Sequence, residues 1–530
     1  MRVSQPPTRA EVNPSPADWF ISADDRGNPH TALDRRRGGA WSLGNEVRPL
    51  IHGAAYFTEL LASVRRMRAG DLLMFTDWRG DPDERLDGPG SDVAGVFADA
   101  ARRGVHVRGL MWRSHRDAMR YHQTENRLLG ATVQAAGGEC LLDMRVRGGG
   151  SHHQKFVVLR HPGRPDLDVA YLGGIDLCHG RRDDASHQGD PQPCPIGPVY
   201  GPRPPWHDVQ VAIHGPAVGD IETVFRERWE DPAPLTRNPV RRWRDRILRP
   251  NGPLPCPPRP PDPPACGTHA VQVLRTYPNR RRGYAFAPEG ERSIARAYLK
   301  AVGRARRLVY LEDQYIWSPY VVGVFARALA ANPDLRMIAI VPHIPDRDNP
   351  MYNAPQLLAR AQSLDLLRRA GGDRVAVYGL ENPAGTPVYV HAKVCAVDDT
   401  WLAVGSDNVN LRSWTYDSEL TCAVLDESGC GDGLARRVRL ALAREHLDRR
   451  DGDDHDLRDA ARAFDAFATS ARRLAAWYDG GRQGRRPPGR LRPYSSTTMD
   501  GMTARWAAPL YRMLYDPDGR PSGLRCRDEF

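Results

Sequence analysis

The stretch SHHQKFVVLR at residues 151–160 and its counterpart VHAKVCAVDD at residues 390–399 share one pattern, a histidine followed two positions later by a lysine. We call His153–Lys155 and His391–Lys393 the two His-x-Lys frames. They contain two of the three lysines in the chain, although the sequence has 75 basic residues and uses arginine almost everywhere else. Lysine is a compact point charge, whereas arginine is a planar fork. The pattern therefore indicates that both frames need the compact charge for chemistry.

Similar elements precede each frame, so the repeat extends over most of the chain. Apolar periodicity predicts helix, strand, helix, strand and a helical segment before the strand of each frame. In the first half we expect a helical pattern from Val47, strands at 72–78 and 105–112, and a helix at 93–103. In the second half we expect helices at 291–305, 321–331 and 353–371, and strands at 307–313, 335–342 and 375–380. The repeat distance of about 240 residues is far longer than that of a solenoid and indicates an internal duplication.

This order of elements predicts the fold class and the division of the chain. Alternating strands and helices are typical of an α/β protein, here with two similar α/β/α sandwich lobes whose mixed, mostly parallel sheets are related by a pseudo-two-fold axis. We expect a flexible N-terminal arm at 1–45, a first lobe at 46–230, a proline-rich linker at 231–270, a second lobe at 271–445 and a helical, basic C-terminal extension at 446–530. The short apolar run at 506–515 is expected to dock on the folded protein rather than insert in a membrane.

Composition restricts the partners and the surroundings of the chain. With 530 residues, of which 41% are hydrophobic and 26% charged, it is typical of a globular protein. The net charge of +10 favours anionic partners, either phospholipid at a membrane surface or nucleic acid, unless the arginines only cover solvated surface. The nine cysteines are scattered without a Cys-x-x-Cys pair, which argues against a disulfide framework and against a zinc site. No signal-peptide pattern and no apolar run of membrane-spanning length is evident, so we expect a cytoplasmic protein, peripheral at the membrane if it meets one. Because one chain supplies both frames, a monomer is expected.

The two frames suit the cleavage of a phosphodiester. In a strand, residues i and i+2 project to the same face, so each histidine should point the same way as its lysine. If the halves pack around an axis, two imidazoles and two ammonium groups meet in one pocket. One histidine then attacks phosphorus, the other protonates the leaving oxygen, and the lysines stabilise charge on the remaining oxygens. No metal and no cofactor is expected, because no cluster of carboxylate ligands is evident.

Each imidazole also needs a partner that fixes its tautomer. The candidates are Asp208 in the first half and Glu419 in the second, with Asp417 as a competitor of Glu419. Small residues follow each frame, at 173–176 (GGID) and 405–408 (GSDN), and allow a phosphate to approach closely. The predicted substrate contacts on these segments are Asp176, Ser406 and Asn408.

At these residues the sequence resembles the phospholipase D superfamily, whose signature is His-x-Lys followed by four residues and Asp. The second copy matches in full, with His391, Lys393 and Asp398, and continues with GSDNVNLRSW and DSE. The first copy has Arg160 where the family has Asp, and then continues with GGID and PWHD. The segment EDQYIW at 312–317 is similar to the Glu-Asn-Gln-Tyr segment of lipid-cleaving members, which suggests Gln314 and Tyr315 as further pocket residues. The resemblance spans about residues 47–445.

The resemblance implies catalysis through a covalent phosphohistidine, with His153 as nucleophile and His391 as acid and then base. It further implies that Asp208 and Glu419 orient the imidazoles and that Asp398 is structural. The implied reaction is hydrolysis of glycerophospholipids to phosphatidic acid and a free headgroup, or transfer of the phosphatidyl group to an alcohol. Three alternatives stay open: a phosphatidyltransferase resembling cardiolipin synthase, a nuclease or DNA-end phosphodiesterase, and a degenerate lipid- or nucleic-acid-binding protein.

Overall fold

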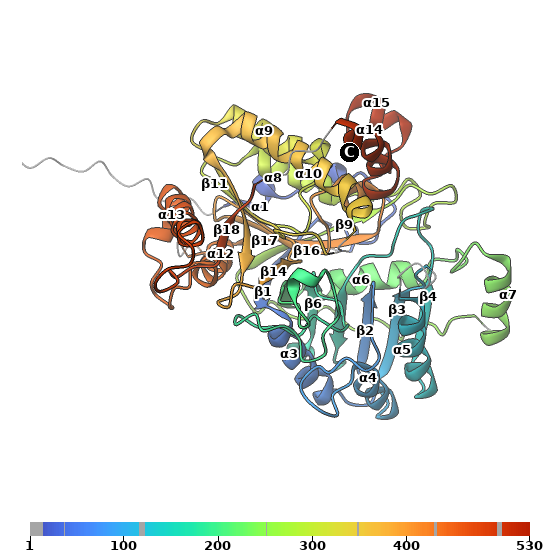
Figure 1. Ribbon diagram of the computed structural model, residues 1–530. Helices are drawn as coiled ribbons and strands as arrows, with labels where there is room; N and C mark the ends of the chain where they lie inside the picture. Colours follow the sequence, from blue (N-terminus) through green and yellow to red (C-terminus); the bar gives the residue numbers. More distant parts are fainter. Residues whose placement is uncertain are drawn as a thin grey trace, which may run out of the picture.

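The first half of the chain forms one mixed sheet. The computed structural model describes residues 14–36, 38–115, 122–250, 252–346, 349–428, 432–495 and 501–530 (Figure 1). The strands of this sheet follow the order β4, β3, β2, β5, β6, β8, β1; β2 to β4 run parallel and the other neighbours antiparallel. Their bounds are β1 Ser42–Ile51, β2 Leu72–Asp77, β3 His106–Trp112, β4 Glu139–Asp143, β5 Phe156–Arg160, β6 Val169–Gly173 and β8 Val209–His214, and the short β7 covers Trp206–His207.

The second half repeats this sheet strand for strand. Its order is β13, β12, β11, β15, β16, β17, β9, again with three parallel strands, β11 to β13, beside antiparallel ones. The bounds are β9 His269–Tyr277, β11 Leu308–Glu312, β12 Arg336–Ile340, β13 Val375–Glu381, β15 Val394–Val397, β16 Trp401–Gly405 and β17 Glu419–Asp426, with β10 Glu291–Arg292, β14 Pro387–Val390 and β18 Leu491–Pro493 at the margins. β1 and β9, which hold equivalent positions, pair antiparallel and join the two sheets. The predicted mixed α/β fold with two related halves is confirmed.

Helices cover both faces of each sheet (Figure 1). The outer layers are formed by α3 Gly53–Arg66, α4 Val93–Arg102 and α5 Gln123–Ala135 in the first half, and by α8 Ser293–Gly303, α9 Pro319–Ala331 and α10 Pro350–Gly371 in the second. The inner layer contains α6 Ala217–Trp229 and α12 Leu434–His446, whose apolar side chains share one hydrophobic core with strands of both sheets. This continuous core fixes the two halves against each other.

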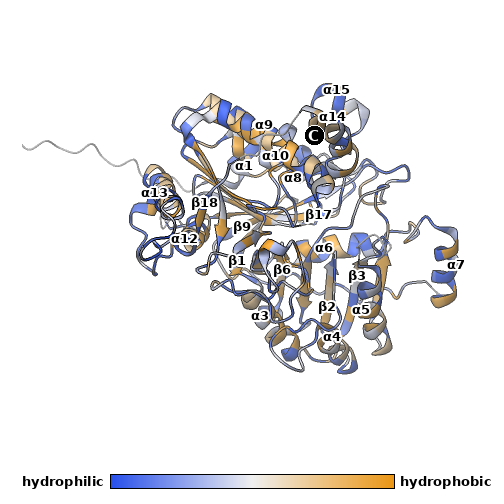
Figure 2. Ribbon diagram, viewed as in Figure 1, coloured by the Kyte–Doolittle hydropathy of each residue, from blue (hydrophilic) through white to orange (hydrophobic). Residues whose placement is uncertain are grey.

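The strands that lead out of the frames are short and apolar on both faces, as expected for strands covered on both sides. In β5, the side chains from Phe156 to Leu159 are at most 2% exposed. Burying each of them contributes about 1.5–3 kcal/mol to the free energy of unfolding. Figure 2 shows that the hydrophobic residues gather in these sheets. The frames are therefore attached to rigid parts of the molecule.

The described part of the expected N-terminal arm is packed, so the prediction of a flexible segment is wrong there. Phe20 and Ile21 follow the short helix α1 Pro16–Trp19 and lie in the core of the second half. The Ile21 amide donates to Gln272 Oε1 at 3.1 Å, and in α2 Ala23–Arg26 the Arg26 guanidinium pairs with Glu291 at 2.9 Å. The predicted helix from Val47 begins only at Gly53, because 42–51 forms β1. Residues 1–13 lie outside the described part.

Two further helical regions lie outside the duplicated core. The proline-rich segment contains α7 Pro239–Leu248, and the C-terminal extension contains α13 Ala460–Asp479, α14 Gly501–Leu510 and α15 Ser522–Arg527. Tyr511, in a π-turn after α14, donates its hydroxyl to the Trp317 carbonyl at 2.8 Å, so the apolar run at 506–515 docks on the second half as expected. Among the described residues, no helix combines the length and the apolar character needed to cross a membrane.

Candidate active site

The two frames lie where the halves meet, just outside the strands in which the sequence suggested them. His153 and Lys155 precede β5, and His391 and Lys393 lie between β14 and β15. Their backbones bind the opposite half instead of continuing the ladder: the His153 amide donates to the Ser418 carbonyl at 2.9 Å, and the His391 amide donates to the His207 carbonyl at 2.8 Å. This crosswise bonding brings the frames together.

The orienting carboxylates are exchanged between the halves. His153 Nδ1 lies 2.9 Å from Glu419 Oε2, and His391 Nδ1 lies 2.7 Å from Asp208 Oδ2. The sequence offered Asp208 for the first half and Glu419 for the second, so the two residues are the expected ones but their assignment by half is corrected. The physical reason is that β7 ends, and β17 begins, beside the frame of the other half, and that His207 and Ser418 at these points bond the backbone of that frame. A carboxylate on Nδ1 leaves Nε2 of each ring available for chemistry.

Both lysines point toward the histidines of the site. Lys155 Nζ donates to the His153 carbonyl at 2.9 Å and lies 3.5 Å from Asp176. Lys393 Nζ donates to the His391 carbonyl and to Gln314 Oε1, the latter at 3.3 Å. Burial, followed by the charge of the lysine in its own frame, lowers the pKa of both His153 and His391, and the lysine of the other frame lowers each further. The four groups therefore act on one another across the axis.

These electrostatics set the protonation of the resting site. Burial beside lysine keeps both imidazoles neutral at neutral pH, which leaves His153 able to act as a nucleophile. Burial also raises the pKa of Glu419 to about 7 and lowers the pKa of Lys393 to about 8. Glu419 and Lys393 thus titrate close to physiological pH, which is common at functional sites.

The remaining predicted residues fall into two groups. Ser406 donates to Glu419 Oε2 at 2.5 Å, and Asp176 accepts from the amides of Trp78 and Arg79 at 3.2 Å each, so both support the frames. Asn408 is buried, and its Oδ1 has no hydrogen-bond partner among the described residues.

The segment at 312–317 contributes unequally to the site. Gln314 joins Lys393 to the Tyr389 hydroxyl, to which its Nε2 donates at 2.9 Å. Tyr315 instead stacks on Trp317, with ring centroids 3.8 Å apart. Asp313, which replaces the Asn of the lipid-cleaving pattern, accepts from the amides of Tyr315, Ile316 and Val409 and so shapes the loop.

Aromatic and arginine side chains around the frames were missed by the sequence reasoning. Trp78 stands edge-on to His153, with ring centroids 6.0 Å apart, and Trp206 lies beside His391 at 5.0 Å. The Arg181 guanidinium covers the Trp206 ring at 3.7 Å and lowers the pKa of His391 after burial and Lys393 do. Trp206 adjoins His207 and Asp208 in the PWHD segment, so its position in the sequence was a usable signal. Arg181 offered none among the many arginines.

The residues that close the two signatures are both structural. Asp398 accepts from the amides of Arg307 and Leu308 at 2.8 and 2.9 Å and so holds the turn before β11, as the bracing role expected for it requires. Arg160 at the equivalent place is buried and pairs with Asp168 at 2.8 Å and with Glu222. The missing aspartate is thus replaced by a different set of ion pairs at the end of β5.

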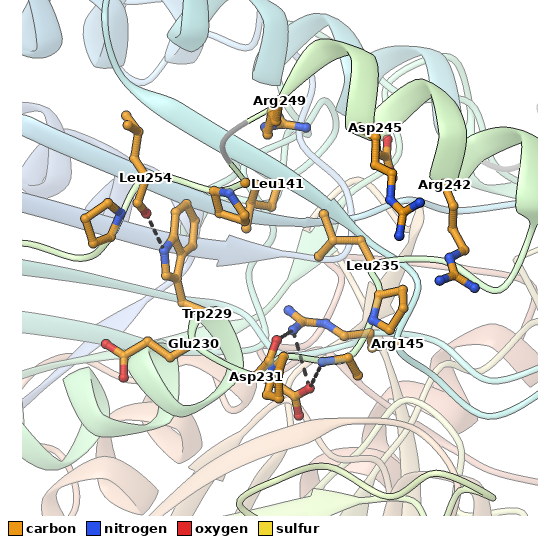
Figure 3. A pocket seen from close by; sticks show the side chains of 17 residues that line it. Leu141, Arg145, Trp229, Glu230, Asp231, Leu235, Arg242, Asp245, Arg249 and Leu254 are labelled. Carbon is orange, nitrogen blue, oxygen red and sulfur yellow. Dashed lines mark hydrogen bonds and ion pairs between the residues drawn. The ribbon is translucent and has the colours of Figure 1, made fainter.

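A cavity of about 500 Å³ lies away from these groups, beneath α7 (Figure 3). Its walls include Trp229 and Leu254, whose indole and carbonyl are hydrogen-bonded at 2.9 Å, together with Arg242 and Arg246 of α7. Neither histidine of the frames lines it. We therefore locate the candidate active site at the frames and not in this larger space.

The fold and the site define a duplicated α/β protein with one His-x-Lys frame in each half. Part of the chain is similar to a known family: the sequence model of the family "Phospholipase D" matches residues 92–245. Phospholipase D alpha 1 of Cynara cardunculus is 26% identical over 68% of this chain and 59% of its own length, and that of Carica papaya is 25% identical over 79% and 69%. The chain thus spans about three fifths of the first of these relatives. A phosphatidylserine synthase from Haemophilus influenzae has the same fold, with a TM-score of 0.50 at 14% identity over 74% of this chain and 84% of that one.

Proposed function

We propose that this protein is a phospholipase D-type phosphodiesterase that cleaves glycerophospholipids through a phosphohistidine on His153. The observation that carries the proposal is the pair of His–carboxylate contacts that cross between the halves, with a lysine beside each histidine. His153 Nε2 would attack phosphorus while Glu419 holds the proton on Nδ1. His391, oriented by Asp208, would protonate the leaving alcohol and then take a proton from the incoming water or alcohol. Each atom that leaves or enters is accounted for by these two imidazoles.

The lysines supply the remaining requirement of this chemistry. Charge accumulates on the non-bridging oxygens as the nucleophile adds to phosphorus, and Lys155 and Lys393 flank that position. One such contact at 4 Å is worth about 4 kcal/mol at an effective dielectric of 20. Arg181 adds a third positive charge near His391. The set therefore fits a phosphodiester substrate.

An exposed helix in the proline-rich segment favours a substrate in a membrane over a dissolved one. Two ion pairs attach α7 to the first half. Asp245 pairs with Arg113 at 2.7 Å, and Arg249, at the C-terminal end of the helix, pairs with Glu139 at 2.9 Å. The opposite stripe is apolar and faces solvent: Val240, Trp243 and Ile247 are 57% to 70% exposed. Figure 2 shows both characters in this helix. Arginines beside an exposed apolar stripe are the pattern of a helix that lies in an anionic membrane interface.

A series of side-chain interactions links this helix to the first frame. The pKa of His115, which follows β3, is lowered by burial, then by Arg412 and then by Arg241 of α7. Arg412 also binds Asp417 at 2.8 Å, and Asp417 accepts from the Ser151 amide beside the first frame. The relatives named phospholipase D alpha 1 support the same substrate class. We therefore expect α7 to attach the protein to the membrane that contains the substrate.

The first experiment offers phosphatidylcholine vesicles to the wild-type protein with EDTA and a little ethanol present. We expect release of choline together with phosphatidic acid and phosphatidylethanol, and loss of all three in His153→Ala and in His391→Ala. His214→Ala, which changes a histidine in β8 outside the site, serves as the control. Folded wild-type protein that leaves lipid intact but degrades polynucleotide, with a steep dependence on salt, would move the assignment to a nuclease.

The second experiment tests the role of α7. Trp243→Gln and Ile247→Gln should lower the ratio of the rate on anionic vesicles to the rate on a monomeric short-chain phospholipid by roughly tenfold, since an interfacial helix acts through its buried apolar area. Arg281→Gln, a change at a basic residue outside α7, is the matched control. An unchanged ratio in both α7 variants would remove this helix from the membrane contact.

A further inference from the structure

A second group of buried histidines lies directly behind the candidate active site. His52, His187 and His207 surround Glu445, and one ligand atom of each of the four residues lies within 4.8 Å of all the others. Glu445 Oε2 is 2.7 Å from His52 Nε2, and its Oε1 is 3.0 Å from His187 Nε2 and 3.7 Å from His207 Nδ1. The histidines are fully buried or nearly so. Four distant parts of the chain thus direct three imidazoles at one carboxylate.

The outer nitrogens of two of these rings, those of His207 and His187, are held as they are in metal sites. His207 Nε2 lies 2.6 Å from Glu312 Oε2, and His187 Nδ1 lies 3.4 Å from Asp183 Oδ2. Histidines that bind metal usually give their other ring nitrogen to a carboxylate, which fixes the tautomer and leaves a lone pair for the ion. His207 Nδ1 is directed toward Glu445 and has no hydrogen-bond partner among the described residues. Hydrogen bonding within the protein therefore leaves an inward-facing nitrogen unused.

The backbone at two of these histidines is in a conformation that favours glycine. His52 has φ of 69° and ψ of 158°, and His187 has φ of 51°. Residues with side chains adopt such angles only where the surrounding structure imposes them. Here the result is that the His52 and His187 rings meet edge to face, with centroids 4.8 Å apart. Arg490 lies 3.8 Å from Glu445 Oε1 and also donates to the Ala185 carbonyl.

We propose that His52, His187, His207 and Glu445 bind one divalent transition-metal ion, with zinc as the best match. Three imidazole nitrogens and one carboxylate oxygen are a common donor set for tetrahedral zinc, whereas calcium and magnesium prefer oxygen ligands. Four protein ligands complete the coordination, so the site is structural. It stands next to Asp208: His207 precedes this residue, and the His52 amide donates to the Asp208 carbonyl at 2.9 Å. The ion would hold in place the carboxylate that orients His391.

The test measures metal directly, so it does not depend on the proposed lipase activity. Wild-type protein is purified without chelators, incubated with excess Zn²⁺, desalted and analysed for metal; we expect about one zinc ion per chain. X-ray absorption should report about four nitrogen or oxygen ligands, the multiple scattering that is typical of coordinated imidazole, and no sulfur ligand. His187→Ala and Glu445→Gln should each lower the zinc affinity by at least roughly tenfold. The matched control is His269→Gln, which changes a buried histidine that also pairs with a carboxylate, Asp426 at 3.4 Å, outside the cluster.

Measurements on the wild type keep the test decisive if a variant fails to fold. Replacing zinc by Co²⁺ should give the intense visible absorption of a four-coordinate site, and adding Zn²⁺ to metal-free protein should raise its melting temperature. A chain that takes up no zinc or cobalt under these conditions would overturn the proposal. So would zinc that is retained in both folded cluster variants, because the ion would then bind elsewhere.

Discussion

His153 and Glu419 are 266 residues apart in the chain, yet His153 Nδ1 lies 2.9 Å from the Glu419 carboxylate. The equivalent contact joins His391 to Asp208, 183 residues away, at 2.7 Å. Each half of the molecule thus provides the imidazole of one pair and the carboxylate of the other. The ring of each histidine is therefore oriented by the half to which it does not belong.

This exchange predicts different defects for the two carboxylate variants. Asp208→Asn should impair protonation of the leaving group by His391, which costs roughly 10²- to 10⁴-fold on phosphatidylcholine. The same variant should be much less impaired on a p-nitrophenyl phosphodiester, whose leaving group needs no proton. Glu419→Gln should slow attack by His153 on both substrates. Single-turnover rates on the two substrates measure this, and the reverse pattern would exchange the roles of the histidines.

The charge of Lys393 predicts a limit to activity at high pH. Because burial lowers the pKa of Lys393 to about 8, its ammonium group loses the proton just above neutral pH. We expect kcat/KM to fall as the pH rises through about 8. Any residual activity of Lys393→Arg should not show this decrease in kcat/KM at high pH, since a guanidinium does not titrate in that range. A wild-type profile that stays level up to pH 10 would contradict the assignment.

Glu419 predicts a conflict between activity and stability. Burial raises its pKa from 4.5 to about 7, so the folded protein keeps a proton that the unfolded chain has released between these values. The stability that comes from this proton is complete below pH 4.5 and is lost as the pH rises through 7. Glu419→Gln cannot titrate, so it should gain up to about 3 kcal/mol relative to wild type across that range. Urea unfolding at several pH values measures the difference, with the exposed Glu230→Gln as control; a difference independent of pH would refute the effect.

Arg160 predicts a large cost in stability at a distance from the frames. Its removal in Arg160→Met leaves Asp168 and Glu222 buried without their shared guanidinium, which typically costs about 3–5 kcal/mol. Arg48→Met removes an exposed pair with Glu59 and should cost less than about 1 kcal/mol. Chemical denaturation compares the two. Similar losses in both variants would show that the buried pairs contribute little.

Much of the fold follows from the sequence, because the periodicity of short buried strands is strong. The expected strands at 72–78 and 307–313 agree closely with β2 and β11, since both are apolar runs bounded by polar residues. Residues 42–51 were harder to interpret: β1 pairs with β8 on one side and β9 on the other, and this pairing across the chain leaves only a weak local pattern. The packed segment around Ile21 depends on Gln272, 251 residues away, which no local pattern reveals.

The candidate site was predictable in its chemistry and not in its connections. The histidines, the lysines and both carboxylates could be named because their residue types and spacing are unusual. Which carboxylate meets which histidine depends on the relative placement of β7 and β17, and the sequence does not contain it. The cluster around Glu445 could not be predicted for the same reason, since its residues come from separate segments of the chain. The scattered cysteines argued against zinc, but this cluster uses none.

The exchange of carboxylates also bears on how such a chain diverges. Away from the candidate site the halves are free to differ. Arg160 and Asp398 occupy equivalent positions after the two frames, but one binds carboxylates and the other binds backbone amides. Where the halves meet, they cannot differ independently, because substituting a carboxylate in one half removes the group that orients the imidazole of the other half. After a duplication, residues at the periphery of the two halves can therefore change independently, whereas residues that meet at the centre must change together.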